Sequence, residues 1–174
     1  MKKYLVIGNP IEHSLSPKLH NYWFEKNNID ANYDRRKIDK SEIEETINEI
    51  KSNKLDGINV TVPFKNDVIP FLDMLSKESQ ITQSVNTIYK QDKKLIGHNT
   101  DIKGFELSLK ETKFNLENKT IFILGAGGVV PSIIYALEKL GVSKIIASNR
   151  TKQKTEDLKK KFSNISVVDW GDQP

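Results

Sequence analysis

The chain has 174 residues, of which 37% are hydrophobic and 29% charged, as is ordinary for a soluble globular protein of one large or two small domains. It has no cysteine, which excludes disulfides, thiolate metal sites and a cysteine nucleophile and favours a reducing compartment. The net charge of +4 comes from residues 144–161, where no aromatic side chains interleave with the basic ones, so nucleic acid is not expected as a partner.

Two apolar stretches bear on localisation. The run after the first three residues stops at Gly8 and is too short for the core of a signal peptide, so we expect a cytoplasmic protein without an export signal. Residues 120–137 carry no charge, but three glycines and Pro131 interrupt them. This pattern favours a buried strand, a glycine turn and a helix over a membrane span.

Strands and helices are expected to alternate through the first hundred residues. Ser16-Pro17 is typical of a helix start with Ser16 as the cap, and Ser41-Glu42-Ile43-Glu44 has the pattern of a capping box. Ile69, Leu72 and Leu75 predict a further helix. Strands are expected at residues 4–8, 31–38, 57–62, 85–89 and 95–96, the last two as a hairpin around residues 90–94. We therefore predict an α/β fold with an open, mainly parallel, three-layer αβα domain.

Residues 118–174 have the pattern of a nucleotide-binding fold. Strands are expected at residues 120–124, 144–148 and 165–168, separated by helices at residues 129–140 and 151–162. This β-α-β-α-β series is one mononucleotide-binding half of a Rossmann fold. Because the chain ends at Pro174, we expect the second half to be absent and the Rossmann domain to be truncated.

A glycine turn stands between the first strand and the first helix of this series. In Gly125-Ala126-Gly127-Gly128, followed by Val129, the backbone can approach a pyrophosphate whose charge the helix N-terminus stabilises. A plain tight turn is the alternative. The position directly after a strand and before a helix favours dinucleotide binding.

The end of the next strand bears on the choice of cofactor. NAD-binding folds place Asp or Glu there for the ribose 2′-hydroxyl, whereas this chain has Asn149-Arg150-Thr151, with Lys152 and Lys154 behind. Arg150 can stack on adenine and pair with a 2′-phosphate that a carboxylate would repel, so NADP is the predicted cofactor. A surface arginine after a strand is the alternative.

The segment from Gly8 to Pro17 leaves a strand and enters a helix. It places two hydroxyls, Ser14 and Ser16, at a helix N-terminus, which is a favourable place for a carboxylate. A simple capping loop has the same pattern, and the residues alone leave both interpretations open.

Further polar residues stand beside strand ends. Asn59 and Thr61 share one face of a predicted strand, and Lys65 follows its carboxyl end, where ligands bind in open α/β sheets. Asn86 and the run Asn99-Thr100-Asp101 stand beside the ends of the following strands. These residues are the candidates for a second ligand site in the first half of the chain.

Together these segments resemble the shikimate dehydrogenase family over essentially the whole chain. The Ser-x-Ser-Pro, Asn-Val-Thr-x-Pro-x-Lys and Asn-Thr-Asp motifs appear in the order and spacing of the family. The resemblance implies the reversible reduction of 3-dehydroshikimate to shikimate with NADPH, a step in aromatic amino-acid (chorismate) biosynthesis.

The resemblance also implies roles for the motif residues. Lys65 and Asp101 form the implied catalytic pair, and a lysine beside a carboxylate suits proton transfer to a ketone oxygen as hydride arrives. The residues implied to bind substrate are Ser14, Ser16, Asn59, Thr61, Lys65, Asn86 and Asp101. The residues expected to bind NADP are Gly125, Ala126, Gly127, Gly128, Val129, Asn149, Arg150, Thr151 and Lys154.

The implied domain organisation is a substrate-binding and catalytic domain at residues 1–101, a linker helix and turn at 102–117, and the first half of a Rossmann NADP-binding domain at 118–174. Two alternatives remain: a quinate/shikimate dehydrogenase that uses NAD, and a fragment that binds ligand without catalysis. We expect a monomer or homodimer that binds shikimate or 3-dehydroshikimate, with no membrane, nucleic-acid or metal partner. One departure from the family is Gln83-Ser84 in place of Gly-Ala, and we expect Gln83 to crowd the turn that presents Asn86.

Overall fold

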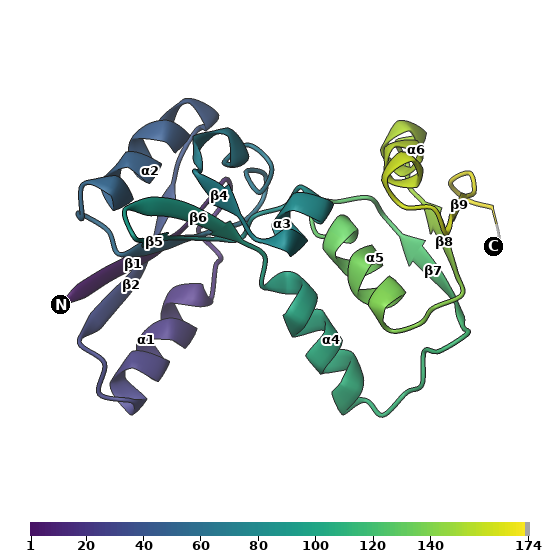
Figure 1. The fold of residues 1–174 in the computed structure, drawn as a ribbon, viewed down its shortest axis with the longest axis horizontal. Helices are drawn as coiled ribbons and strands as arrows, with labels where there is room; N and C mark the ends of the chain where they lie inside the picture. Colours follow the sequence, from purple (N-terminus) through teal and green to yellow (C-terminus); the bar gives the residue numbers. More distant parts are fainter. Residues whose placement is uncertain (173–174) are drawn as a thin grey trace. The chain divides into compact units, whose positions relative to one another are not determined.

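The computed structural model describes residues 1–172, which pack into two compact units. The first unit comprises Met1–Asn99 and the second begins at Thr100 (Figure 1). The finer division into a substrate domain, a linker and a nucleotide domain stays a prediction. Within residues 1–172, every helix is too short or too polar to cross a membrane.

The first unit is built on a six-stranded sheet with the strand order β2-β1-β3-β5-β6-β4. Its strands are β1 (Lys2–Gly8), β2 (Ala31–Lys37), β3 (Gly57–Val60), β4 (Met74–Leu75), β5 (Thr87–Gln91) and β6 (Lys94–His98). β1 runs parallel to β2 and β3, whereas β5 is antiparallel to β3 and β6. The α/β class is confirmed, and the sheet is mixed because the predicted hairpin, β5 and β6, forms part of it.

Helices lie on the two faces of this sheet (Figure 1). α2 (Ile43–Lys51) buries Ile43, Ile47 and Ile50 completely, and this i, i+4, i+7 spacing places all three on one side of the helix. They pack against the residues of β1 and β3 that point toward α2. α1 (Ser16–Lys26) lies on the other face of the sheet, where Phe24 packs with strand residues that point away from α2.

The two predicted helix starts are displaced by one and by two residues. The N-cap of α1 is Leu15, and Ser16 is the first helical residue; its N–H donates to Ser14 Oγ over 3.3 Å. The capping box begins at Asp39, whose backbone N–H donates to the Glu42 carboxylate over 2.6 Å. An acidic residue with Glu three positions later satisfies the same backbone N–H groups as the predicted Ser-Glu pattern, namely those at the helix start that have no partner within the helix.

The helix predicted from Ile69, Leu72 and Leu75 is wrong. The chain makes a short 3-10 turn (Ile69–Phe71) and then β4, which pairs parallel with β6. Leu72 and Leu75 pack over Gly97 of β6, where a Cβ would lie 2.6 and 2.9 Å from their side chains. A three-residue spacing fits a 3-10 turn as well as an α-helix, and contact with the sheet decides between them.

The second unit begins with α4 (Asp101–Glu111) and continues as the predicted β-α-β-α-β series. Its further elements are β7 (Thr120–Leu124), α5 (Val130–Lys139), β8 (Lys144–Ser148), α6 (Lys152–Lys161) and β9 (Ile165–Val167). The three strands are parallel, in the order β7-β8-β9. Ile134 of α5 and Leu158 of α6 pack into one core with the buried residues of β8, and Phe105 of α4 packs against it.

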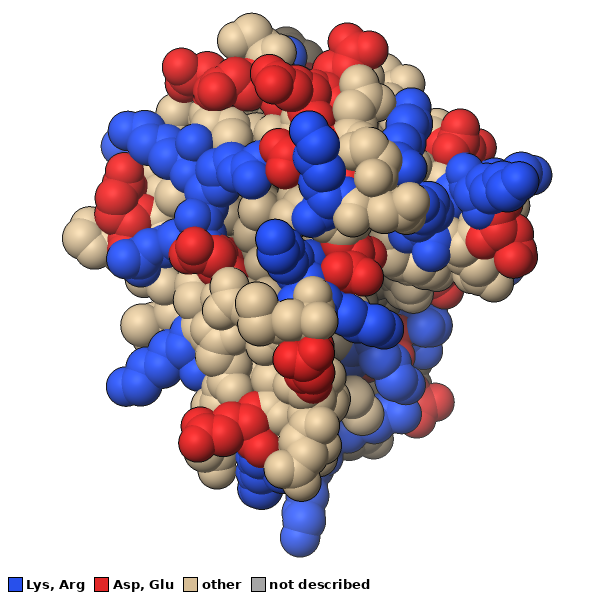
Figure 2. All heavy atoms as spheres, turned by 90° about the vertical axis from the view of Figure 1, so that its left-hand side faces the viewer, with Lys and Arg blue, Asp and Glu red and all other residues tan. Residues whose placement is uncertain are grey.

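Basic and acidic side chains are intermingled on the face of the molecule in Figure 2. Two of the ion pairs in the first unit are Arg36 with Glu49 and Lys40 with Asp67, each over 2.5 Å. Because neighbouring charges of opposite sign cancel beyond a few ångströms, the face in view presents no extended field of one sign.

Gly8, the last residue of β1, allows the chain after β3 to approach closely. A Cβ at this position would lie 2.6 Å from Thr61 Cγ2 and 3.0 Å from both Ile11 Cδ1 and the Val62 carbonyl oxygen. Any larger residue would therefore have to displace the backbone or side chain of its neighbours.

We expect Gly8→Ala to lower the free energy of unfolding by about 1–3 kcal/mol, the usual cost of overpacking. Gly104→Ala is the control: this helical glycine has no neighbour within 4 Å of the added Cβ, and alanine there should raise stability by about 0.5–1 kcal/mol. Denaturant unfolding of both variants checks the pair, and a Gly8→Ala protein as stable as the unsubstituted one would contradict the close approach.

Gln83 does not crowd the turn before Asn86. It ends α3 (Lys77–Thr82) in the left-handed region, at φ 51°, and its exposed side chain donates to the Gln80 carbonyl oxygen over 2.7 Å. The cost of glutamine here is therefore in its backbone conformation, which glycine adopts without a steric penalty.

Gln83→Gly is expected to raise the free energy of unfolding by about 0.5–1 kcal/mol, because only the side chain makes the left-handed conformation unfavourable. Gln83→Ala removes the same amide but keeps the Cβ, so it should give no gain. Thermal unfolding of the two variants separates these effects; equal stability of the glycine and alanine variants would refute the explanation.

Candidate functional site

The carboxyl ends of β1, β3 and β6 and the amino end of β5 meet at one edge of the first sheet. β1 pairs Ile7 with Val60 of β3, while Thr87 of β5 lies opposite Asn59 on one side and His98 on the other. The polar residues next to these strand ends are Ser14, Ser16, Thr61, Lys65, Asn86 and Asn99. In open α/β sheets this edge is where ligands bind.

Ser14, Ser16 and Thr61 line one pocket of about 280 Å³. The loop that carries the serines is held by its own backbone, since the Ser14 N–H donates to the Ile11 carbonyl oxygen over 3.0 Å. Arg35 of β2 donates to the Ser14 carbonyl oxygen over 3.4 Å. Two hydroxyls at the start of α1 can donate to a carboxylate, which the helix N-terminus also favours.

Asn59 links several segments at the middle of the sheet. Its Oδ1 accepts from the Tyr33 hydroxyl over 2.7 Å, and its Nδ2 donates to Thr87 Oγ1 over 3.0 Å and to the Asn86 carbonyl oxygen over 3.1 Å. Thr87 Oγ1 in turn donates to Asn86 Oδ1 over 3.0 Å. Asn59 and Asn86, both candidates from the sequence, are thus joined through Thr87.

The loop of Lys65 is fastened to the segment before Asn86. The Lys65 carbonyl oxygen accepts the N–H of Val85 over 2.9 Å. The buried Asn99 donates from Nδ2 to the Ser84 carbonyl oxygen over 2.9 Å. These bonds hold three candidate strand ends in one place.

Asp101, the other half of the predicted catalytic pair, is the first residue of α4. It follows Asn99 by two positions and belongs to the second unit, whereas Lys65 belongs to the first. Its pairing with Lys65 therefore stays a prediction.

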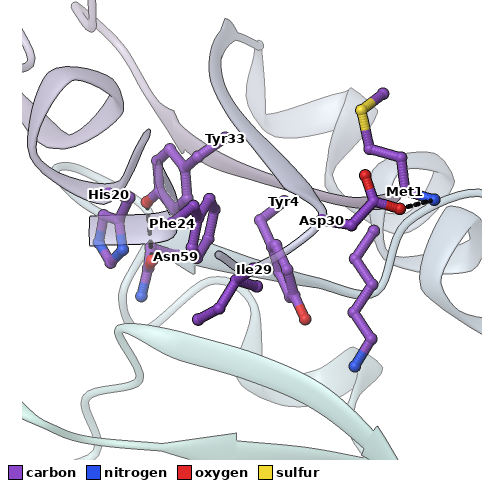
Figure 3. Close-up of a pocket in the computed structure, with 9 residues that line it drawn as sticks. Met1, Tyr4, His20, Phe24, Ile29, Asp30, Tyr33 and Asn59 are labelled. Carbon is purple, nitrogen blue, oxygen red and sulfur yellow. Dashed lines mark hydrogen bonds and ion pairs between the residues drawn. The ribbon is translucent and has the colours of Figure 1, made fainter. Parts of the chain in front are cut away.

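Tyr33 is a polar residue of this region that the sequence analysis did not single out. It is 3% exposed, and no motif marks it, because a tyrosine in a strand is most often a core residue. A second pocket, of about 760 Å³, opens beside it and is lined by rings such as Tyr4, His20 and Phe24 (Figure 3). We assign no substrate to this larger pocket, because its lining is mainly apolar and Asn59 is its one residue from the predicted substrate set.

The glycine turn of the second unit forms a cradle at the start of α5. Gly125 adopts φ 111°, which glycine tolerates and other residues rarely do, and the space where Cβ atoms of Gly127 and Gly128 would stand is open. Ala126 donates its N–H to Asn149 Oδ1 over 3.2 Å. Val129 is the N-cap of α5. The backbone is accessible here and precedes a ten-residue helix, so these residues fit a pyrophosphate.

Asn149 holds the turn against the end of β8. Besides accepting from Ala126, it donates from Nδ2 to the Thr151 carbonyl oxygen over 2.9 Å. Arg150 lies between these two residues and is exposed, as is Lys154 on α6. A guanidinium group beside a pyrophosphate cradle fits the adenosine end of NADP.

Lys152, next in the chain, is engaged within the unit. Its ammonium group lies 2.6 Å from the Asp169 carboxylate, and this hydrogen bond raises the pKa of Lys152 above its ordinary value. Lys152 is therefore engaged with Asp169, and Arg150 and Lys154 are the basic residues predicted to hold the cofactor.

Two family models match the chain. The family model described as "Shikimate dehydrogenase substrate binding domain" matches residues 6–88. The one described as "Shikimate / quinate 5-dehydrogenase" matches residues 106–171.

Individual relatives agree with these matches. A protein of Pelagibacter ubique named "Shikimate dehydrogenase (NADP(+))" is 58% identical over 98% of this chain and 64% of its own length. The crystal structure of shikimate dehydrogenase from Aquifex aeolicus matches with a TM-score of 0.91 at 40% identity, over 97% of this chain and 62% of that one. The Thermus thermophilus enzyme in complex with NADP(H) and shikimate matches with a TM-score of 0.87 at 30% identity, over 97% and 63%.

The chain thus spans less than two thirds of the length of these relatives. Both matched models, the identity over nearly the whole chain and the superposition of solved structures point to a single family. This chain belongs to the shikimate dehydrogenase family.

Proposed function

We propose that the protein is an NADP-dependent shikimate dehydrogenase that reversibly reduces 3-dehydroshikimate to shikimate in aromatic amino-acid biosynthesis. One observation carries the proposal: Ser14, Ser16, Thr61, Lys65 and Asn86 gather at one edge of the first sheet. The shikimate bound to the Thermus thermophilus relative supports the choice of substrate. On this proposal residues 1–101 bind substrate, residues 102–117 link the domains and residues 118–174 bind NADP. The protein would act in the cytoplasm.

The substrate carries a carboxylate at one end and hydroxyls around its ring. The hydroxyls of Ser14 and Ser16, which lie beside the N-terminus of α1, would donate to the carboxylate. Asn59, Thr61 and Asn86 carry the short polar side chains that suit ring hydroxyls, and Asp101 would accept from one of them. This arrangement gives the ring a single orientation over the strand ends.

Lys65 and Asp101 would form the proton-transfer pair. In the reducing direction the Lys65 ammonium group donates a proton to the ketone oxygen, which becomes the hydroxyl of shikimate. The Asp101 carboxylate would orient that ammonium group. NADPH, when bound, supplies the hydride.

The cofactor would be held by the second unit. The glycine turn from Gly125 to Gly128, with Val129, would face the pyrophosphate, since the Cβ positions of its glycines have no neighbour within 4 Å. The residues after β8, Asn149, Arg150 and Thr151, together with Lys154, would surround the adenosine 2′-phosphate.

The proposal is tested by following the oxidation of NADPH with 3-dehydroshikimate, beside the binding of shikimate by calorimetry. Comparison with NADH separates this function from an NAD-dependent quinate/shikimate dehydrogenase. Shikimate binding without turnover would favour a ligand-binding chain. Sedimentation of the same sample decides between monomer and homodimer.

Lys65→Ala is expected to reduce turnover by about 10²–10⁴-fold while leaving shikimate affinity within a few fold, because the lysine acts mainly as the proton donor. Steady-state kinetics and calorimetry measure the two effects. Lys54→Ala, which removes an exposed lysine before β3, is the control and should leave both unchanged. Near-normal turnover in Lys65→Ala would remove this residue from the mechanism.

Arg150→Ala should weaken NADPH binding by about 10- to 100-fold and NADH binding little, since a charge-assisted contact to a phosphate is lost. Fluorescence titration with each nucleotide measures both constants. Lys159→Ala removes a positive charge from α6 in the same unit and should affect neither cofactor strongly. Equal weakening toward NADPH and NADH would mean that Arg150 recognises something other than the 2′-phosphate.

A further inference from the structure

Tyr33 is held rigidly on the face of the sheet that α1 covers. Its backbone N–H donates to Asn21 Oδ1, and its carbonyl oxygen accepts from Asn21 Nδ2, both over 2.8 Å. Its ring stacks on that of His20, with 4.2 Å between centroids and 5° between planes (Figure 3). Ring and backbone are therefore fixed by contacts that do not involve the hydroxyl.

The hydroxyl of Tyr33 contacts a residue of the predicted substrate site. It donates to Asn59 Oδ1 over 2.7 Å, a bond that Figure 3 shows as a dashed line. Tyr33 lies in β2 and Asn59 in β3, so this bond spans the strand between them, β1.

Each hydrogen bond in this chain fixes the direction of the next. Because Asn59 Oδ1 accepts from Tyr33, the Nδ2 end of the same amide faces Thr87 Oγ1 and the Asn86 carbonyl oxygen, to both of which it donates. Thr87 then uses its only proton toward Asn86 Oδ1. Through Asn59 and Thr87, the Tyr33 hydroxyl thus takes part in orienting the Asn86 amide.

Burial keeps this hydroxyl protonated. It raises the pKa of Tyr33 well above its ordinary value, whereas the nearby Ser16 side chain lowers it to a smaller extent. Burial also lowers the pKa of His20, so the ring stacked on Tyr33 is neutral near pH 7. The tyrosine can therefore act as a hydrogen-bond donor over the whole physiological range.

We propose that Tyr33 is a positioning residue of the shikimate site, whose hydroxyl orients the amides of Asn59 and Asn86 for the substrate. The inference rests on the proposed function, because it takes these two residues to contact shikimate. Tyr33 itself touches no substrate and acts through them.

Tyr33→Phe tests the inference, because phenylalanine keeps the ring on His20 and removes only the hydroxyl. We expect the dissociation constant of shikimate to rise about 10-fold, the effect of losing one hydrogen bond that preorganises a site. The dissociation constant of NADP should stay within about 2-fold. Calorimetry with shikimate and with NADP measures both constants in the full chain, and thermal unfolding verifies that the variant is folded.

Tyr4→Phe is the matched control. Tyr4 lies on the same face of the sheet and lines the same pocket, and its ring packs with Phe24 (Figure 3). Loss of its hydroxyl should leave shikimate affinity unchanged. An unchanged shikimate constant in Tyr33→Phe, or an equal loss in Tyr4→Phe, would overturn the inference and leave the proposed function standing. No shikimate binding by the unsubstituted protein would instead overturn the proposed function and the inference with it.

A double-mutant cycle with Asn86→Ala adds a readout that a purely structural role would not move. If Tyr33 acts through Asn86, the combined variant should lose less shikimate affinity than the product of the two single losses. Losses that multiply would show that Tyr33 does not act through Asn86 and would overturn that step of the proposal.

Discussion

The parallel pairing of β1 with β3 is the constraint on which the candidate site depends. Its register aligns Ile7 with Val60, so the two chains leave the sheet at the same edge. The absence of a side chain at Gly8 then lets Thr61 come within contact of the loop that carries Ser14 and Ser16. A shift of one residue in this register would turn Asn59 to the opposite face and separate it from Tyr33.

Asparagine side chains fasten these segments to one another. Asn59 and Asn99 each bond to backbone of another segment of the first unit, and Asn149 connects the glycine turn with the end of β8 in the second. Asn21 likewise ties α1 to β2. An amide both donates and accepts, so it can join two loops without adding charge to a half-buried position. Aspartate would lose the donor in each case.

The sequence was most informative where local patterns coincide with the final contacts. The second unit follows its predicted series, and Ile43, Ile47 and Ile50 form the buried side of a helix as their spacing predicts. Residues around Leu72 were misjudged because contact with Gly97 of the sheet, far away in the chain, decides their conformation. Tyr33 was missed for a related reason: its bond to Asn59, in another strand, is encoded by no local pattern.

The two outer strands of the first sheet differ in length and in composition. β2 runs Ala31–Lys37 and ends in Asp34, Arg35, Arg36 and Lys37, whereas β4 consists of Met74–Leu75 alone. A foreign strand that approached β2 would have to accept this row of charges, and β4 offers too few backbone groups to template one. The first unit therefore carries its own protection against edge-to-edge aggregation at both outer strands.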